Sequence, residues 1–250
     1  GDNDLVVRVH EYHREFGFAY NWQGNWSGLY RSVELTATGE SFLGSFALYP
    51  DADKQELRIV ARIGGFSNHP LSLQIAVTPA GATATKPVAA EFAVNAPDFI
   101  STLAIPSPRR WSPDAPNLYR IEAKLTDGKK IHDAQIERTG FVKLAADGHR
   151  FLINAEPYYI RGTGDFLSCP ETGCPDTDRD RWRRKLKALR AYGYNQVRCQ
   201  SNVYGPEYYD VADEVGMLVQ SEMGMLGAWS GHSIYHVYPW PQPMAGNRAV

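Results

Sequence analysis

The periodicity of the apolar residues changes near residue 150, and this change restricts the fold more than any other feature of the sequence. Before it, apolar and polar residues alternate in short segments that are separated by Gly, Pro, Asn and Asp. A period of two is typical of half-buried β-strands. The clearest cases cover residues 57–63, 71–77 and 121–125. Strands at roughly 10–15-residue spacing indicate a β-sandwich.

After residue 150 the pattern predicts the order strand, helix, strand, helix, strand. The strands are expected at residues 158–162, 195–199 and 217–220. Two βα units that lead into a third strand imply a parallel sheet with right-handed crossovers. A complete (β/α)8 barrel needs about 250 residues, and only 100 remain after position 150. We therefore expect this part to be a piece of a larger fold.

Sequence signals mark both ends of each helix. The first helix is expected to begin at a cap cluster, residues 176–178, and to end before Gly193, which favours a left-handed cap. The second is expected to run from Pro206 to Gly216. The first helix has an apolar face formed by Trp182, Leu186, Leu189 and Tyr192, and a basic face, expected to be solvated, formed by Arg181, Arg184, Lys185 and Lys187.

Composition excludes two classes of function. The formal net charge is −2, and Lys and Arg are scattered apart from the run on the first helix, whereas nucleic-acid binding needs a basic surface. No apolar stretch approaches the 18 or more residues of a membrane span, so no membrane partner is expected. Hydrophobic residues make up 43% of the chain, which is enough to bury a core.

The three cysteines leave two alternatives open. Cys169 and Cys174 lie in one loop, where a disulfide would favour a periplasmic or secreted location. The alternative is that both cysteines are reduced thiols. A zinc site is not expected, because no second pair of Cys or His lies nearby in the sequence. We expect Cys199 not to act as a nucleophile, since no sequence signature supplies it with a base.

Four segments, in the order in which they occur, resemble glycoside hydrolase family 2, which includes β-galactosidases, β-glucuronidases and β-mannosidases. They are residues 26–35 (WSGLYRSVEL), residues 111–119 (WSPDAPNLY), residues 138–162 with RTGF and YIRG at their ends, and residues 195–222 with NQVRC, DEVGMLV and SE. The resemblance implies three parts. Residues 1–37 would be the last strands of a jelly-roll sugar-binding domain, residues 38–145 an immunoglobulin-like β-sandwich, and residues 146–250 strands one to three of a (β/α)8 TIM barrel.

The resemblance also implies the chemistry of the parent protein. Family members hydrolyse terminal β-linked sugars with two glutamates and retention of configuration. By resemblance, the acid/base lies in an Asn-Glu pair after barrel strand four and the nucleophile after strand seven. The chain contains no Asn-Glu dipeptide, so both glutamates are expected beyond Val250, and we expect these residues alone to be inactive. Carbohydrate is the implied partner, and no cofactor is implied.

Supporting residues are expected at the C-terminal ends of the three strands, where barrel active sites are built. For Glu222 the alternative is an ion pair with Arg161 or Arg198, and for Asp165 it is a plain loop carboxylate. Aromatic loop packing is the alternative for Trp229. The substrate-binding candidates are Asp165, Arg198, Gln200, Asn202, Glu222 and Trp229.

The sequence departs from the family pattern at several positions. Phe166 and Ser201 stand where family members have histidines, which leaves the sugar specificity open. Leu226 and Ala228 stand where some β-galactosidases have metal ligands, so a magnesium site is not expected there.

Two other classes of function compete with the enzyme. A non-catalytic carbohydrate-binding module would use Trp22, Trp26 and Trp229 as contacts. A homo-oligomeric scaffold would use the β-sandwich as its interface. Sugar binding without turnover would favour the first, and a strict monomer in light scattering would remove the second.

Overall fold

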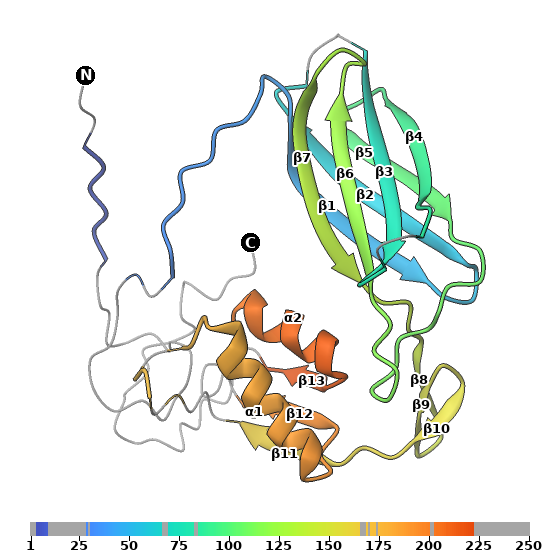
Figure 1. The fold of residues 1–250 in the computed structure, drawn as a ribbon, viewed down its shortest axis with the longest axis vertical. Helices are drawn as coiled ribbons and strands as arrows, with labels where there is room; N and C mark the ends of the chain where they lie inside the picture. Colours follow the sequence, from blue (N-terminus) through green and yellow to red (C-terminus); the bar gives the residue numbers. More distant parts are fainter. Residues whose placement is uncertain are drawn as a thin grey trace, which may run out of the picture. The chain divides into compact units, whose positions relative to one another are not determined.

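The computed structural model describes residues 4–9, 29, 31–66, 70–82, 85–165, 169, 171–173, 175–200 and 203–222. They form two compact units. One is Glu34–Ile160, and the other combines Gly1–Val33 with Arg161–Val250. Figure 1 shows the strands of the first unit and the helices of the second.

The first unit contains a sandwich of two antiparallel sheets. One sheet has the order β1-β2-β5 and the other β4-β3-β6-β7, an arrangement that fits an immunoglobulin-like domain. The strands are β1 (Phe42–Asp51), β2 (Glu56–Gly64), β3 (Leu71–Pro79), β4 (Val88–Val94), β5 (Asp98–Ala104), β6 (Tyr119–Thr126) and β7 (Ile131–Thr139).

The core of the sandwich lies between the two sheets and follows the predicted alternation. Every second residue of β2, β3 and β6 is buried, and all these side chains belong to one cluster. Burying a Val, Leu or Ile side chain contributes about 1.5–3 kcal/mol each. The period-two pattern therefore determines which face of each strand points inward, and the prediction for these three strands is confirmed.

A small antiparallel sheet follows the sandwich within the first unit. Its strands are β8 (Leu144–Asp147), β9 (Arg150–Ile153) and β10 (Glu156–Tyr158). Asn154 and Ala155 form the turn between β9 and β10 with φ values of 54° and 72°, as a two-residue hairpin turn requires. The Asn154 side chain donates to the carbonyl of Trp111 at 2.9 Å and accepts the Lys143 N–H at 3.1 Å, which fastens the turn to the sandwich.

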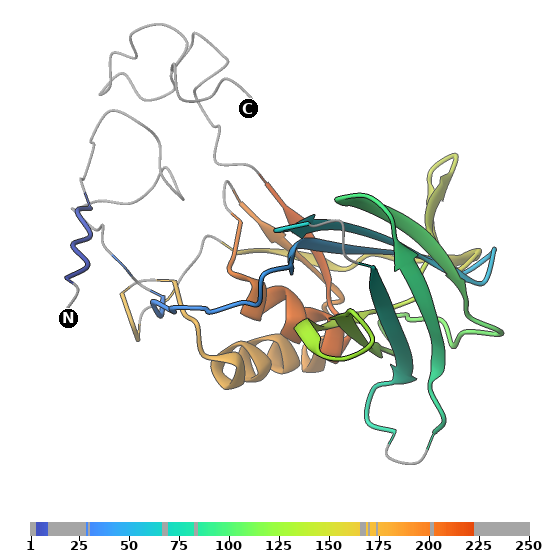
Figure 2. The ribbon, with the colours of Figure 1, turned by 90° about the horizontal axis from the view of Figure 1, so that it is seen from above.

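The second unit contains a three-stranded parallel sheet in the order β11-β12-β13. Both helices pack on the same face of it, as Figure 1 and Figure 2 show. Neither helix has the length and apolar character that a membrane crossing requires. The elements, in chain order, are β11 (Gly162–Asp165), α1 (Arg179–Ala191), β12 (Gln196–Cys199), α2 (Pro206–Val215) and β13 (Leu218–Ser221).

The predicted ends of both helices are confirmed, but the predicted buried face of α1 is wrong at one residue. Asp178 is the N-cap of α1, and Gly193 follows the helix with φ of 91°. Gly216 caps α2 in the left-handed conformation. Tyr192, which we expected on the buried face of α1, is 84% exposed. It is the C-cap residue, so the chain leaves the helix axis before this ring can reach the sheet.

Two predicted strands differ from the structure. The run 158–162 is divided, because Tyr158 ends β10 and Gly162 begins β11. Tyr159, between them, is 79% exposed. The described residues 29 and 31–35, expected to end a strand, form none. An extended segment becomes a strand only where its backbone pairs with a neighbouring strand, and none of the sheets in the described residues includes this segment.

Candidate functional site

The parallel sheet of the second unit has two chemically different faces. Side chains alternate along a strand, so neighbouring positions point to opposite sides. Val197 and Cys199 are fully buried against the helices. Arg198 lies between them on β12 and points to the other side, where it is about half exposed. Register then places Gly164 and Gln220 on the side of Arg198, and Asp165 on the side of Cys199.

The face without helices carries a row of polar groups. Gln196 donates from Nε2 to Oε1 of Gln220 at 3.2 Å. A β-carbon at position 162 would approach Oε1 of Gln196 to 2.1 Å, so the glycine there gives the amide room to lie across β11. Parallel sheets are usually covered on both faces by apolar layers. No described helix or apolar cluster covers this face, so its polar side chains are a candidate site.

Arg198 and Glu222 form an ion pair at the C-terminal end of this face. The Arg198 Nε donates to Oε1 of Glu222. This pairing was one of the two alternatives for Glu222. Arg161, the other arginine considered, instead donates to the carbonyl of Gly193 at 2.6 Å. The pair places one cation and one anion beside each other where strands β12 and β13 end.

Asp165 lies on the opposite face, beneath the helices. It is the last residue of β11 and is 7% exposed. Its Oδ2 accepts a hydrogen bond from Nζ of Lys185 at 2.6 Å. Lys185, which we expected on a solvated basic face, is 32% exposed, and its ammonium group reaches this carboxylate. Its Nζ also lies 5.4 Å from the centre of the Trp182 ring.

Aromatic rings and a thiol surround the Asp165–Lys185 pair. Tyr204 stacks on Tyr208 with ring centres 4.2 Å apart and meets Trp182 edge-on at 5.2 Å. Burial, and then the neighbouring Asp165 carboxylate, raise the pKa of the Tyr204 phenol. The same two causes raise the pKa of the Cys199 thiol to about 12. Cys199 is therefore protonated at neutral pH and unsuited to nucleophilic attack.

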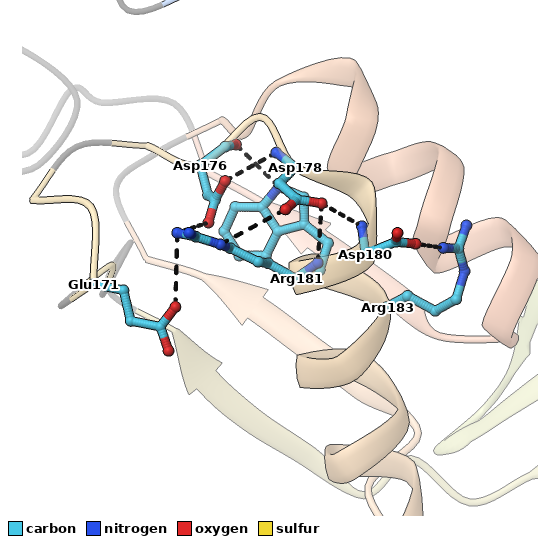
Figure 3. A network of polar contacts seen from close by, with 7 residues as sticks. Glu171, Asp176, Asp178, Asp180, Arg181 and Arg183 are labelled. Atoms are coloured by element: carbon cyan, nitrogen blue, oxygen red, sulfur yellow. Dashed lines mark hydrogen bonds and ion pairs between the residues drawn. The ribbon is translucent and has the colours of Figure 1, made fainter.

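The segment that leads into α1 is held by a polar network, drawn in Figure 3. The Asp178 carboxylate accepts the backbone N–H groups of Asp180 and Arg181 at 2.7 and 3.3 Å. Arg181 pairs with Asp176 at 3.3 Å, and Trp182 donates from Nε1 to the carbonyl of Asp176 at 3.0 Å. These contacts fix the end of the connection between β11 and α1. Each has a partner inside the network, and none points to a ligand.

The remaining candidates are described in part. The backbone N–H of Gln200 donates to the carbonyl of Asp165 at 2.9 Å, which ties the start of the β12–α2 segment to β11. The described residues contain no group of three His, Cys, Asp or Glu that could hold a metal. Asn202, Trp229, Phe166, Ser201, Leu226, Ala228 and Cys174, with Trp22 and Trp26, lie outside the described residues.

Sequence reasoning missed the pairing of Lys185 with Asp165. It considered Tyr204, with Gln200 and Asn202, as a sugar contact, whereas the structure buries this ring, which is 5% exposed, in the aromatic cluster. A signal for Lys185 existed, because it follows Trp182 by three positions and precedes Leu189 by four, spacings that place it beside the buried face of a helix.

Comparisons with known proteins agree on one family. Residues 42–141 match glycosyl hydrolases family 2. The chain is 33% identical over 123 residues to a putative β-glucuronidase of Formosa agariphila, a match that covers 48% of this chain and 12% of that protein. It is 26% identical over 235 residues to a β-galactosidase of Photobacterium profundum, covering 89% of this chain and 22% of that protein.

Solved structures show the same fold. A glycosyl hydrolase family 2 member from Bacteroides cellulosilyticus superposes with a TM-score of 0.65 at 20% identity, over 74% of this chain and 27% of that one. β-Glucuronidase 2 of Bacteroides uniformis gives 0.62 at 20% identity, over 75% and 24%. The chain thus spans less than a third of each of these proteins. The family model thus matches the sandwich, and the relatives and solved structures that this chain resembles are named as glycosidases of glycosyl hydrolase family 2 or as β-galactosidases and β-glucuronidases.

Proposed function

We propose that this chain is part of a β-glycosidase and that β11, β12 and β13 are the first three strands of its catalytic (β/α)8 barrel. The polar face of the parallel sheet, which no helix of the described residues covers, carries the proposal. In a barrel this face would be turned inward, and the C-terminal strand ends would meet at the active site. The helices already cover the outward face. Residues 1–37 and 38–145 would be the jelly-roll end and the immunoglobulin-like domain of the same protein.

Arg198 and Glu222 have supporting roles in this proposal. The reaction would use two glutamates contributed by later residues of the polypeptide, about 5–5.5 Å apart, with retention of configuration. One would attack the anomeric carbon while the other protonates the leaving oxygen. Arg198 would orient carboxylates through its fixed N–H groups. Glu222 would hold Arg198 in place and accept hydrogen bonds from sugar hydroxyls.

Substrate contacts are proposed for the residues beyond the strand ends. Gln200, Asn202 and Trp229 would contact the sugar through amide groups and an aromatic face. Asp165 is left out of this set, because Lys185 occupies its carboxylate on the helix-covered face. The relatives named β-galactosidase and β-glucuronidase support a terminal β-linked sugar as the substrate class.

Aryl glycoside hydrolysis tests the proposal. The full-length protein that contains this sequence and the 250-residue chain would each be incubated with p-nitrophenyl β-galactoside, β-glucuronide and β-mannoside. We expect hydrolysis with retained configuration by the full-length protein and none by the chain alone. Sugar binding without turnover by the full-length protein would contradict the proposal and favour a carbohydrate-binding module.

A variant pair tests the role of Arg198. Arg198→Gln in the full-length protein removes the charge that pairs with Glu222, and activity is expected to fall by about 100-fold, or roughly 2.7 kcal/mol of transition-state stabilisation. Arg184→Gln is the matched control, because Arg184 is an exposed arginine of α1. Wild-type activity in Arg198→Gln would remove this residue from the mechanism.

A further inference from the structure

An ion pair links the N-terminal part of the chain to helix α2. Arg31 donates from Nη2 to Oε1 of Glu207, across 176 positions of sequence. Both residues belong to the compact unit that combines Gly1–Val33 with Arg161–Val250. Glu207 lies in the first turn of α2, the helix that follows the C-terminal end of β12. The pair therefore joins a segment that precedes the sandwich to the end of the parallel sheet at which its strands stop.

The Glu207 side chain folds back toward the residue that begins its own helix. A β-carbon at Gly205, the N-cap, would lie 2.6 Å from Oε2 of Glu207. Gly205 has φ of −68° and ψ of 160°, which any residue can adopt, so the backbone does not require a glycine. A Ser or Asp would also supply the side-chain cap that α2 lacks. The glycine instead leaves the space that the Glu207 carboxylate occupies.

Arg31 is the partner that orients this carboxylate. The Glu207 side chain is 21% exposed and that of Arg31 42%. Oε2 of Glu207 is buried and accepts no hydrogen bond from the described residues. A carboxylate that is partly withdrawn from water is unfavourable unless an opposite charge lies beside it. Among the described residues, the structure pairs Glu207 with no cation other than Arg31.

The start of α2 is in turn connected to the candidate site. The phenol of Tyr209 and the hydroxyl of Ser221 share a hydrogen bond of 2.6 Å. Ser221 is the last residue of β13, and the next residue, Glu222, pairs with Arg198. A shift of the first turn of α2 would therefore displace the strand end that carries Glu222.

We propose that Gly205 and Glu207 form a docking site for Arg31, and that Arg31 and Glu207 are positioning residues. Docking of the N-terminal segment fixes the first turn of α2, and Tyr209 transmits that position to the end of β13. Neither side chain of the pair needs to touch the sugar. The consequence for catalysis rests on the function proposed above. The docking does not.

Hydrogen exchange in the full-length protein tests the docking. Arg31→Gln removes the cation, and Gly205→Ala displaces the carboxylate without removing a charge. Amides of residues 208–211 should exchange about threefold faster in each variant, because the helix start opens more easily. Arg8→Gln is the matched control, since Arg8 is an exposed arginine of the same N-terminal part, and it should change nothing. Unchanged exchange in both test variants would overturn the proposal.

A double variant and salt separate the ion pair from other effects of each side chain. In a Glu207→Gln background, Arg31→Gln should accelerate exchange no further, because the two residues act through one contact. Salt screens exposed ion pairs. Raising NaCl from about 0.05 M to about 1 M should bring wild-type exchange at residues 208–211 close to that of Arg31→Gln, and leave Arg31→Gln unchanged. Additive variants, or an equal salt response in both proteins, would overturn the pairing.

Aryl glycoside kinetics test the consequence for activity. We expect kcat/KM to fall about threefold in Arg31→Gln and in Gly205→Ala, with a melting temperature close to that of the wild type, because exposed ion pairs contribute little stability. Arg8→Gln should keep the wild-type kcat/KM. Wild-type kcat/KM in both test variants would overturn the positioning role. If the wild-type protein hydrolyses no glycoside, the proposed function fails, while hydrogen exchange still decides the docking.

Discussion

The sandwich and the parallel sheet use their faces differently. In the sandwich, the two sheets bury their inner faces against each other and form one closed apolar cluster. In the parallel sheet, the helices bury one face only, and the other face carries Gln196, Arg198 and Gln220. The sandwich therefore has a complete core within the described residues. Within the same residues, the parallel sheet has an apolar cover on one face only, whereas parallel sheets are normally covered on both.

The two parts also differ in where their charged groups lie relative to the core. In the sandwich, β2, β3 and β6 alternate strictly, and the charged residues of these strands lie on the faces away from the core. The parallel sheet has an ion pair on each face, one between Arg198 and Glu222 and one between the buried Asp165 and the partly exposed Lys185. Groups with adjustable charge are typical of functional regions. The following predictions test how far this division holds.

The largest contrast is expected in hydrogen exchange of the 250-residue chain. Amides of β2, β3 and β6 should exchange at least 100-fold more slowly than those of β11, β12 and β13, a difference of about 2.7 kcal/mol in opening free energy or more. The reason is that the open face gives the parallel sheet less buried apolar area. Exchange measured by peptide mass spectrometry checks this. Equal protection in both sheets would contradict the comparison.

A matched pair of core truncations comes next. Leu73 in β3 and Leu186 in α1 are both fully buried. Leu73→Ala should destabilise the sandwich by about 2–5 kcal/mol, while Leu186→Ala should leave the sandwich transition unchanged because it belongs to the other cluster. Urea unfolding followed by exchange in sandwich peptides measures both. A shift of the sandwich midpoint in Leu186→Ala would show that the two cores are coupled.

Alkaline pH should destabilise the parallel sheet and the helices that pack on it. Burial raises the pKa values of Tyr204 and Tyr208, and that of Cys199 to about 12. The unfolded chain loses these protons at lower pH than the folded chain, so stability falls as pH rises above about 9. At pH 9, alkylation of Cys199 by iodoacetamide should be at least tenfold slower than in urea-unfolded chain. Rapid alkylation of the folded chain would contradict the burial.

Acid should destabilise the sandwich. Hydrogen bonds from the backbone of Lys130 and Lys129, and then from His132, lower the pKa of Asp127 in the β6–β7 turn. The backbone N–H of Lys54 lowers the pKa of Asp51 in the same way. Their contribution is present above the pKa of the unfolded carboxyl and is lost as pH falls below it. Asp127→Asn should therefore reduce the acid sensitivity of the sandwich midpoint between pH 5 and about 3, measured by the same urea unfolding.

The smallest effect is expected at the start of α1. Asp178→Ala removes the carboxylate that accepts two backbone N–H groups and should cost about 1 kcal/mol of helix stability. Thr177→Ala, the exposed neighbour, is the control. Exchange in the first turn of α1 is the measurement, and an equal change in both variants would show that the cap has no special role.

The sequence by itself determined the features that depend on short stretches of chain. Alternation fixed the inward faces of β2, β3 and β6, because a strand has only two faces and the apolar one must be buried. Cap residues fixed the ends of α1 and α2, because Asp178 and Gly216 act through their own backbone neighbourhood. The prediction of one strand over residues 158–162 was wrong, because an apolar run does not indicate which of two sheets its residues will join.

The tertiary structure alone decided which side of the parallel sheet each candidate occupies. Asp165 and Arg198 both lie near strand ends in the sequence, yet they point to opposite faces. Alternation in strands of four residues is too short to reveal which face the helices will cover. The partners of the two ion pairs are 20 and 24 residues apart. Pairing at that separation depends on how helices pack on strands, which no local pattern in the chain records.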